Sequence, residues 1–293
     1  MNSNRTTISL VILLSLAFFG VLALSQPLGE SDNIHAPKKA NEEVSSTRQF
    51  VAPDLRARAV LVFDPHTREV LYEKESGRVL PLASLTKIMT AIVALEHYRG
   101  ETLVETAPGI SWSLTQFLER MLVNSSNTAA ETVAALPFGP GEQGFVVAMN
   151  NKARRLGFDR MYFRNSTGLD VGPQTAGGEG TATEVAELLW YGTRVHPKLF
   201  AATSEERLTL RTATGDRYSV YNTNQIVASL PAVLASKTGL TDLAGGNLAM
   251  IIDAGIEHPI VIVILGSSEA GRFTDIQKLT QATLAYFASD VTR

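Results

Sequence analysis

Residues 81–100 read PLASLTKIMTAIVALEHYRG, a few small polar residues that run into a long and almost wholly apolar stretch. This pattern predicts a buried helix from about Leu82 to Tyr98, closed by Gly100. Ser84 and Lys87 stand three residues apart near its start, so they project from the same face. A buried ammonium carries a large desolvation cost unless it is paired or gives up its proton. Lys87 therefore either extends its charged end to water or is kept there to take a proton from Ser84.

Composition excludes several classes of function. The chain has 293 residues, with 26 basic and 29 acidic side chains and a net charge of −3. So small a net charge gives no indication of nucleic-acid binding. Apolar residues make up 45% of the chain, enough for a sizeable core. Cysteine is absent and the five histidines are scattered without an i, i+4 pair, so we expect no disulfide, no metal site and no cofactor.

Residues 1–25 are typical of an export signal. Ile8 to Leu24 carries no charge, and as a helix it would reach about 25 Å, just short of a hydrocarbon core. It is either a signal peptide cleaved after Ser25 or an uncleaved membrane anchor, and the length of the apolar run favours the anchor. Residues 26–52 are polar and mixed in charge, as expected of a flexible linker. Residues 53–293 are predicted to form a single domain outside the cytoplasm.

Strand and helix patterns occur in blocks along this domain. Two β-rich segments around a Pro-His-Thr turn predict a hairpin, apolar helical patterns follow, and β-branched runs then precede a terminal helix. Besides the helix at 82–98, the predicted segments are strands 57–64 and 68–75, helices 113–123, 127–136, 142–157 and 181–195, strands 206–212, 217–223, 234–240, 246–255 and 259–268, and helix 274–288. This order predicts an α+β protein with an antiparallel sheet built from both chain ends and a helical middle.

Three short motifs lie at the edges of these elements: Ser84-Leu85-Thr86-Lys87, Ser125-Ser126-Asn127 and Lys237-Thr238-Gly239. Taken singly, each has a structural explanation, such as a helix cap for Ser84, a helix start for Asn127 or a charged strand edge for Lys237. Together and in this order, they are expected by chance in about 1% of chains or fewer. We therefore interpret them as one site.

Around these motifs the sequence resembles the serine D-Ala-D-Ala carboxypeptidases, the low-molecular-mass penicillin-binding proteins. Residues 57–91 are similar to that family's opening hairpin and nucleophile helix, 145–170 to the segment after its second motif, and 222–226 with 236–250 to its third. The likeness extends from about residue 57 to residue 287. It implies a penicilloyl-serine-transferase fold and action on peptidoglycan stem peptides that end in D-Ala-D-Ala.

The resemblance also implies a role for each residue of the first two motifs. Ser84 is the nucleophile and a neutral Lys87 the general base, its pKa lowered by burial and by the nearby cation of Lys237. Ser125 relays the proton toward the leaving amine. Asn127 supplies amide groups that orient the substrate backbone.

The third motif is expected to bind substrate. Lys237 and Thr238 would hold the terminal carboxylate, while Gly239 would let the peptide lie along the strand edge, as in strand addition. The backbone N–H groups of Ser84 and Leu240 would form the oxyanion hole.

The chain departs from the family pattern in ways that affect substrate preference rather than the catalytic groups. The stretch between Lys87 and Ser125 is short, so small strands usual there are expected to be trimmed. Leu240 replaces a common aromatic or histidine, and Thr128 stands where Asp commonly follows Asn127. A catalytic domain without the family's C-terminal β-domain and membrane-binding helix is expected.

Three alternative functions remain at this point. A class A β-lactamase shares the motifs, but it needs E-x-x-L-N after the second motif, whereas the near match from Glu119 to Asn124 precedes it. A D,D-endopeptidase and a catalytically silent peptidoglycan-binding protein are the others.

The expected partners are stem peptides, β-lactams and, through residues 1–25, a bacterial membrane. The expected location is the cell envelope, outside the cytoplasmic membrane. The sequence gives no indication of oligomeric state.

Overall fold

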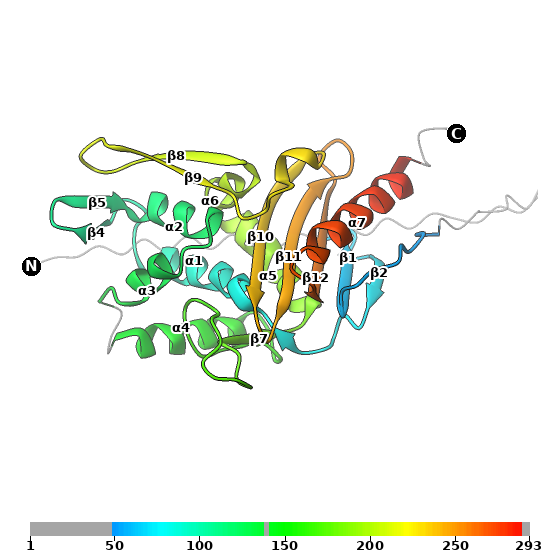
Figure 1. Cartoon of the computed structure of the whole chain (residues 1–293), viewed down its shortest axis with the longest axis horizontal. Coiled ribbons are helices and arrows are strands. Elements are labelled where there is room, and N and C mark those ends of the chain that lie inside the picture. The colour runs from blue at the N-terminus through cyan, green and yellow to red at the C-terminus, as the bar shows by residue number, and fades with distance from the viewer. Residues whose placement is uncertain (1–48, 138–140, 289–293) are drawn as a thin grey trace, which may run out of the picture. The chain divides into compact units, whose positions relative to one another are not determined.

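The computed structural model describes residues 49–137 and 141–288 of the chain. Strands from both ends of the chain lie side by side in a five-stranded antiparallel sheet of order β10-β11-β12-β1-β2 (Figure 1). Its strands are β1 (Ala59–Phe63), β2 (Val70–Lys74), β10 (Val233–Thr241), β11 (Gly245–Asp253) and β12 (Pro259–Ser267). The first and last strands of the chain pair directly, with Ala59 opposite Leu265. The predicted sheet built from both chain ends is therefore confirmed.

Helices occupy the middle and the end of the chain. In the described residues they are α1 (Thr86–His97), α2 (Leu114–Val123), α3 (Asn127–Ala134), α4 (Gly141–Arg155), α5 (Ala182–Val195), α6 (Pro197–Ala201) and α7 (Gly271–Ala288), with 3₁₀ helices η1 (Ala83–Leu85), η2 (Ala202–Ser204) and η3 (Val227–Ser229). Figure 1 shows α1 to α4 gathered beside β10, while α7 lies across the sheet. None of the helices in 49–137 and 141–288 is long and apolar enough to span a membrane.

Short strands form three further small sheets. They pair as β3-β7-β6, β4-β5 and β8-β9. Their bounds are β3 (Leu80–Pro81), β4 (Leu103–Ala107), β5 (Ile110–Ser113), β6 (Tyr162–Phe163), β7 (Gly178–Gly180), β8 (Arg207–Arg211) and β9 (Arg217–Tyr221).

The central strands β1, β11 and β12 of the main sheet are buried on both faces, which explains their almost continuous apolar sequences, whereas β2 is partly exposed. Along β12, Val261 and Val263 pack into a core shared with α1, α2 and α5, whereas Ile260 and Ile262 pack into a second core with α7. Successive side chains of a strand point to opposite faces, so a strand covered on both sides needs an apolar residue at every position. This two-sided burial holds β10, an edge strand, in a fixed position beside the helices.

Some predicted boundaries were wrong. The predicted helix from Leu82 to Tyr98 is split into η1 and α1, and Tyr98 is already extended, with φ −121° and ψ 152°. Gly100 does not close it. A Cβ on Gly100 would lie 2.3 Å from Thr115 Oγ1, so close packing explains the glycine. A β4-β5 hairpin also remains in the segment expected to have lost its small strands.

The start of the packed domain is marked by an aromatic contact. Phe50, which falls in the predicted linker, stacks on Tyr72 of β2 with ring centroids 5.5 Å apart and lies near Tyr286 of α7. Residues 1–48 lie outside the described residues, and with them the predicted signal or anchor.

Candidate active site

Ser84 lies in a strained turn between β3 and α1. It is half-buried, and its neighbour Ala83 has a positive φ of 49°, which is unusual for a residue other than glycine. The side chain of Asn247 on β11 fixes this turn, since its Nδ2 donates to the carbonyls of Pro81 (2.9 Å) and Leu82 (3.1 Å). The main sheet thus sets the position of the serine.

Lys87, one turn along from Ser84, is fully buried and points its amine at three oxygens. Its Nζ lies 3.0 Å from Ser84 Oγ, 2.8 Å from Asn127 Oδ1 and 2.7 Å from the Thr167 carbonyl. Burial lowers the pKa of Lys87 to about 7, against the opposing influence of Glu131. Of the two expected causes, burial is the one that lowers this pKa, while the charge effect between the two lysines falls on the pKa of Lys237. A lysine with this pKa is half neutral near physiological pH and can accept a proton.

The second and third motifs meet at Ser125. Its backbone also has a positive φ, 59°, and its Oγ lies 2.8 Å from Lys237 Nζ. Lys237 also donates to the Thr238 carbonyl at 2.8 Å. Burial, and after it the charges of Lys87 and Arg272, hold the pKa of Lys237 well below the usual value for lysine. Lys237 can therefore return a proton to Ser125 once that hydroxyl has given its own proton away.

The backbone of Asn127 begins helix α3, and its side-chain amide contacts Lys87 of the first motif. It is the first residue of α3, whose N-cap is the preceding Ser126, with the Ser126 Oγ accepting from Ala129 N at 3.1 Å. The Oδ1 atom of Asn127 is taken by Lys87. Its Nδ2 group is left as the donor that can meet a substrate carbonyl.

A loop over residues 164–171 supplies the carbonyl that holds the buried lysine. The side chain of Asn165 organises it, because Oδ1 accepts from the backbone N of Thr167 (3.2 Å) and of Gly168 (2.7 Å). Gly168 has φ 81°, and a Cβ there would lie 1.9 Å from the Ala83 carbonyl. The loop therefore packs directly against the turn that bears Ser84.

The third motif occupies β10, whose outer edge is unpaired among the described strands. Its Gly239 packs against the turn that bears Ser84, since a Cβ would lie 2.8 Å from the Leu82 carbonyl. Close packing is thus a reason for this glycine that sequence reasoning missed. The hydroxyl of Thr238 lies 2.6 Å from that of Thr223, while Leu240 is 40% exposed beside them.

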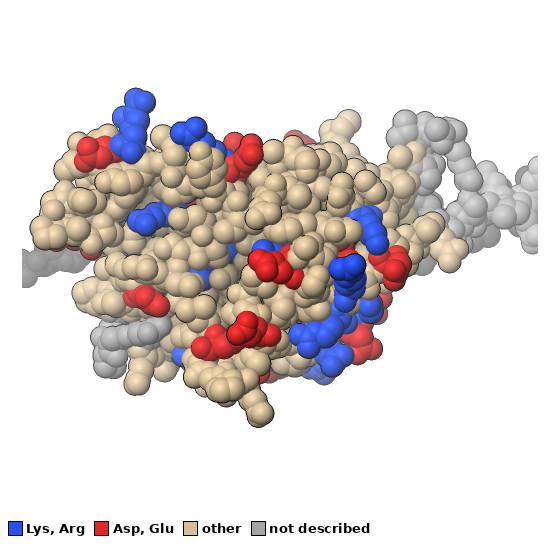
Figure 2. All heavy atoms as spheres, viewed as in Figure 1, with Lys and Arg blue, Asp and Glu red and all other residues tan. Residues whose placement is uncertain are grey.

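Basic atoms lie in a recess between α3 and β10, surrounded mainly by neutral residues (Figure 2). The structure brings the first and third motifs to the second, through the pairs Lys87–Asn127 and Lys237–Ser125. Such a recess can hold the anionic end of a peptide and activate a hydroxyl against its carbonyl carbon.

Sequence reasoning missed several contributors. Thr167 acts through its backbone carbonyl, so its side chain gives no signal. Arg272 is buried and donates to the Gly239 carbonyl at 3.0 Å, but it lies 33 residues beyond the motif. Asn247 is fully buried, and a lone Asn within an apolar strand was the one available signal.

Comparisons with known proteins agree with this geometry. A family model described as D-alanyl-D-alanine carboxypeptidase, Peptidase S11, matches residues 46–108 and 96–269. Penicillin-binding protein D2 from Listeria monocytogenes, solved in its ampicillin-bound form, has a TM-score of 0.67 and 28% identity, covering 80% of this chain and 99% of that one. The predicted penicilloyl-serine-transferase fold is therefore confirmed.

Curated relatives include both exopeptidases and endopeptidases. The chain is 28% identical over 242 residues to D-alanyl-D-alanine carboxypeptidase DacF of Bacillus subtilis, covering 76% of this chain and 61% of the relative. It is also 28% identical over 250 residues to a D-alanyl-D-alanine endopeptidase of Pseudomonas aeruginosa, covering 78% and 76% respectively.

Proposed function

Because the chain belongs to the Peptidase S11 family of D-alanyl-D-alanine carboxypeptidases, we propose that it removes the terminal D-alanine of peptidoglycan stem peptides through an acyl-enzyme on Ser84. The observation that carries this proposal is the 3.0 Å contact between Lys87 Nζ and Ser84 Oγ in a buried site. Burial lowers the pKa of that lysine to about 7, so that a neutral amine able to accept a proton is available near neutral pH.

Acylation begins with a proton transfer from Ser84 Oγ to the neutral Nζ of Lys87. The serine oxygen then bonds to the carbonyl carbon of the penultimate D-alanine. The developing oxyanion is held by the backbone N–H groups of Ser84 and Leu240, which are placed by the contact between the nucleophile turn and β10. The backbone carbonyl of Thr167 and the side-chain Oδ1 of Asn127 accept hydrogen bonds from the ammonium that forms on Lys87.

The leaving amine needs a proton when the peptide bond breaks. Ser125 Oγ donates it and is reprotonated from Lys237, 2.8 Å away. The low pKa of Lys237, caused by burial and by the cations of Lys87 and Arg272, makes this donation easier. Before the second step, Lys87 loses the proton it took from Ser84 and Lys237 regains one, both by exchange with solvent. Water then attacks the ester while the neutral Lys87 accepts its proton, and Lys87 gives that proton to Ser84 Oγ as the ester bond breaks and the enzyme is freed.

Substrate binding uses β10 and Asn127. The peptide adds along the free edge of β10, with the Nδ2 group of Asn127 donating to its backbone. Its terminal carboxylate lies against Lys237 and Thr238, both almost fully buried. A charge-assisted hydrogen bond of this kind favours substrates with a free carboxyl end.

Cross-link cleavage is the second candidate function. It is favoured by the 28% identity to an endopeptidase, equal to that with the carboxypeptidase. Mass spectrometry of purified muropeptides after incubation separates the two. Loss of one D-alanine from pentapeptides indicates the carboxypeptidase, and conversion of dimers to monomers indicates the endopeptidase.

Action on stem peptides places the enzyme in the bacterial cell envelope. Peptidoglycan lies outside the cytoplasmic membrane, so the catalytic domain acts there. The apolar run within residues 1–25 would export the chain or anchor it. The linker of residues 26–52 would then give the domain reach into the wall.

The nucleophile assignment is tested with a fluorescent penicillin, whose ring amide mimics the D-Ala-D-Ala bond. We expect covalent label on Ser84 in the wild type and none in Ser84→Ala with an unchanged melting temperature. Ser229→Ala, at an exposed serine of η3, is the control that keeps its label. Label on another residue in Ser84→Ala would contradict the assignment.

A further inference from the structure

Thr223 lies in the loop after β9 and contacts the third motif. Its Oγ1 lies 2.6 Å from Thr238 Oγ1 and 3.4 Å from the carbonyl of Val123, the last residue of α2. Among the described residues, Thr223 is the partner with which the Thr238 hydroxyl shares a hydrogen bond. Thr223 falls within residues 222–226, which resemble the family's third segment, but no role for it was predicted from the sequence.

The loop holds Thr223 firmly in this position. Its backbone N donates to the Val123 carbonyl at 3.0 Å. The neighbouring Asn222 ties the loop to η2 and the segment after it, with Nδ2 donating to the carbonyls of Thr203 (2.8 Å) and Glu205 (3.0 Å). The Thr223 hydroxyl can therefore turn its proton without moving its oxygen.

The number of protons on the two hydroxyls decides which of Thr223 and Thr238 donates to the other when substrate is bound. A hydroxyl carries one proton and two acceptor sites, whereas a carboxylate only accepts. When Thr238 donates to the substrate carboxylate, its oxygen is free to accept from Thr223. Thr223 can give up its long contact with the Val123 carbonyl, because its backbone N still satisfies that oxygen.

We propose that Thr223 is a positioning residue that orients the Thr238 hydroxyl as a donor and thereby sets the preference for a free C-terminal carboxylate. Consecutive hydrogen bonds polarise one another, so a Thr223–Thr238–carboxylate chain binds an anion more strongly than Thr238 alone. An uncharged substrate end gains much less from the same chain. This proposal rests on the proposed function, in which Thr238 meets the carboxylate, and adds how that hydroxyl is aligned.

The test compares an acyl-D-Ala-D-Ala peptide with its C-terminal amide in the full-length protein. We expect Thr223→Val to lower the ratio of kcat/KM for the carboxylate over the amide roughly tenfold. Thr223→Ser should keep the ratio, because it keeps the hydroxyl. Thr209→Val, the same change at an exposed threonine of β8, is the matched control.

A binding assay gives the same ratio without chemistry. In a Ser84→Ala background, the two peptides are titrated against proteins with and without the Thr223→Val substitution, and the substitution should again reduce the carboxylate preference. An unchanged ratio in both assays, or an equal loss for both peptides, would show that Thr223 is only a brace between α2 and β10. A wild type that neither reacts with penicillin nor releases D-alanine, yet prefers the carboxylate in binding, would refute the proposed function and leave the role of Thr223 standing.

Discussion

At the scale of single residues, the site depends on one costly feature, a lysine buried where its charge is poorly solvated. Lys87 is fully buried, and its pKa is lowered by that burial to about 7. The unfolded chain binds more protons than the folded one between pH 7 and the ordinary lysine pKa. The folded state is therefore penalised in full below about pH 7, and the penalty disappears as the pH rises toward that ordinary value. In the proposed function, this loss of stability is the cost of a neutral lysine that can act as a base.

Lys87→Arg should abolish acylation, because a guanidinium does not lose its proton in proteins. In the wild type, the rate of labelling by fluorescent penicillin should rise with pH through about 7, since only the neutral amine accepts the proton of Ser84. Stopped labelling reactions between pH 5 and 9 measure both effects.

The control is Lys198→Arg at an exposed lysine of α6, which should label normally. Near-normal labelling of Lys87→Arg, or a rate independent of pH, would mean that this position provides charge and not base chemistry.

The residues that the sequence could reveal are those whose side-chain chemistry is itself the signal. Ser84, Lys87 and Lys237 were predicted because their three motifs occur together and in this order, and the structure brings these side chains near one another. Thr167 contributes a backbone carbonyl, and Thr223 contributes a contact made only when two distant loops meet. Neither can be recognised before the chain is folded.

At the scale of elements, positive-φ positions and close contacts hold the loop of residues 164–171 against the nucleophile turn.

The main helices and strands were predicted correctly from the sequence, since each has a clear apolar period. The short β3, β6 and β7 strands were missed because two or three residues show no period. These are the strands that frame the turn and the loop.

Gly168→Ala should therefore lower the unfolding free energy by much more than the strain of a positive φ alone would cause. Gly168 and Gly109 have similar φ values of 81° and 76°, but only Gly168 faces an obstacle, the Ala83 carbonyl at 1.9 Å from a built Cβ. Gly109→Ala should cost about 1 kcal/mol of unfolding free energy from the left-handed conformation. Gly168→Ala should cost several times more and slow the labelling of Ser84 at least tenfold.

Urea denaturation and penicillin labelling of the two variants, side by side, measure these effects. Equal losses of stability, with full labelling in both, would show that the loop does not position the nucleophile turn.

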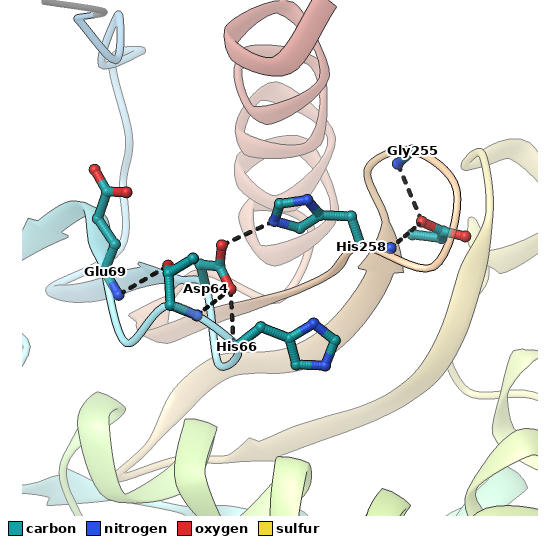
Figure 3. A network of polar contacts seen from close by, with 7 residues as sticks. Asp64, His66, Glu69, Gly255 and His258 are labelled. Carbon is teal, nitrogen blue, oxygen red and sulfur yellow. Dashed lines mark hydrogen bonds and ion pairs between the residues drawn. The ribbon is translucent and has the colours of Figure 1, made fainter.

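At the scale of the whole molecule, a polar network joins the turn after β1 to the turn between β11 and β12, two segments far apart in the sequence (Figure 3). Asp64, after β1, accepts from the backbone N of His66 at 2.8 Å and pairs with His258 Nε2 at 2.8 Å. Burial alone would raise the pKa of Asp64, but hydrogen bonds from His258 and from the His66 and Thr67 amides together lower it. Asp253 accepts from the backbone N of His258 at 3.0 Å and so holds the other side of the network.

Replacing the Asp64 carboxylate should lower the unfolding free energy and also make that free energy less dependent on pH in acid. A carboxylate with a depressed pKa stabilises the fold above its ordinary pKa, and this contribution is lost as the pH falls through the lowered value. We expect Asp64→Asn to lower the unfolding free energy by about 1 kcal/mol at pH 7 and to flatten its decline below about pH 4. Asp242→Asn, at an exposed position, is the control. Parallel acid-unfolding curves for wild type and Asp64→Asn would contradict this role.

The rate at which the acyl-enzyme is hydrolysed depends on whether the groups around Ser84 allow water to reach the ester. Acylation and deacylation each need a base placed for a different nucleophile. With a D-Ala-D-Ala peptide, the departing D-alanine leaves room for water beside Lys87. With penicillin, the opened ring stays attached and blocks that approach. A class A β-lactamase overcomes this with an additional Glu. Among the described residues, no carboxylate is a hydrogen-bond partner of Ser84 or Lys87, and Glu119 precedes the second motif.

The penicilloyl-enzyme should therefore persist for minutes or longer, while a pentapeptide turns over repeatedly. The measurement sets a burst experiment with a chromogenic β-lactam beside D-alanine release from the same preparation. One equivalent of β-lactam consumed per enzyme, with continuing release of D-alanine, is the expected result. Rapid multiple turnover of the β-lactam without D-alanine release would instead mean that water reaches the tethered ester, and that the site works as a β-lactamase despite its missing Glu. Because the two substrates share Ser84 and Lys87, the contrast between them isolates the access of water from the chemistry of acylation.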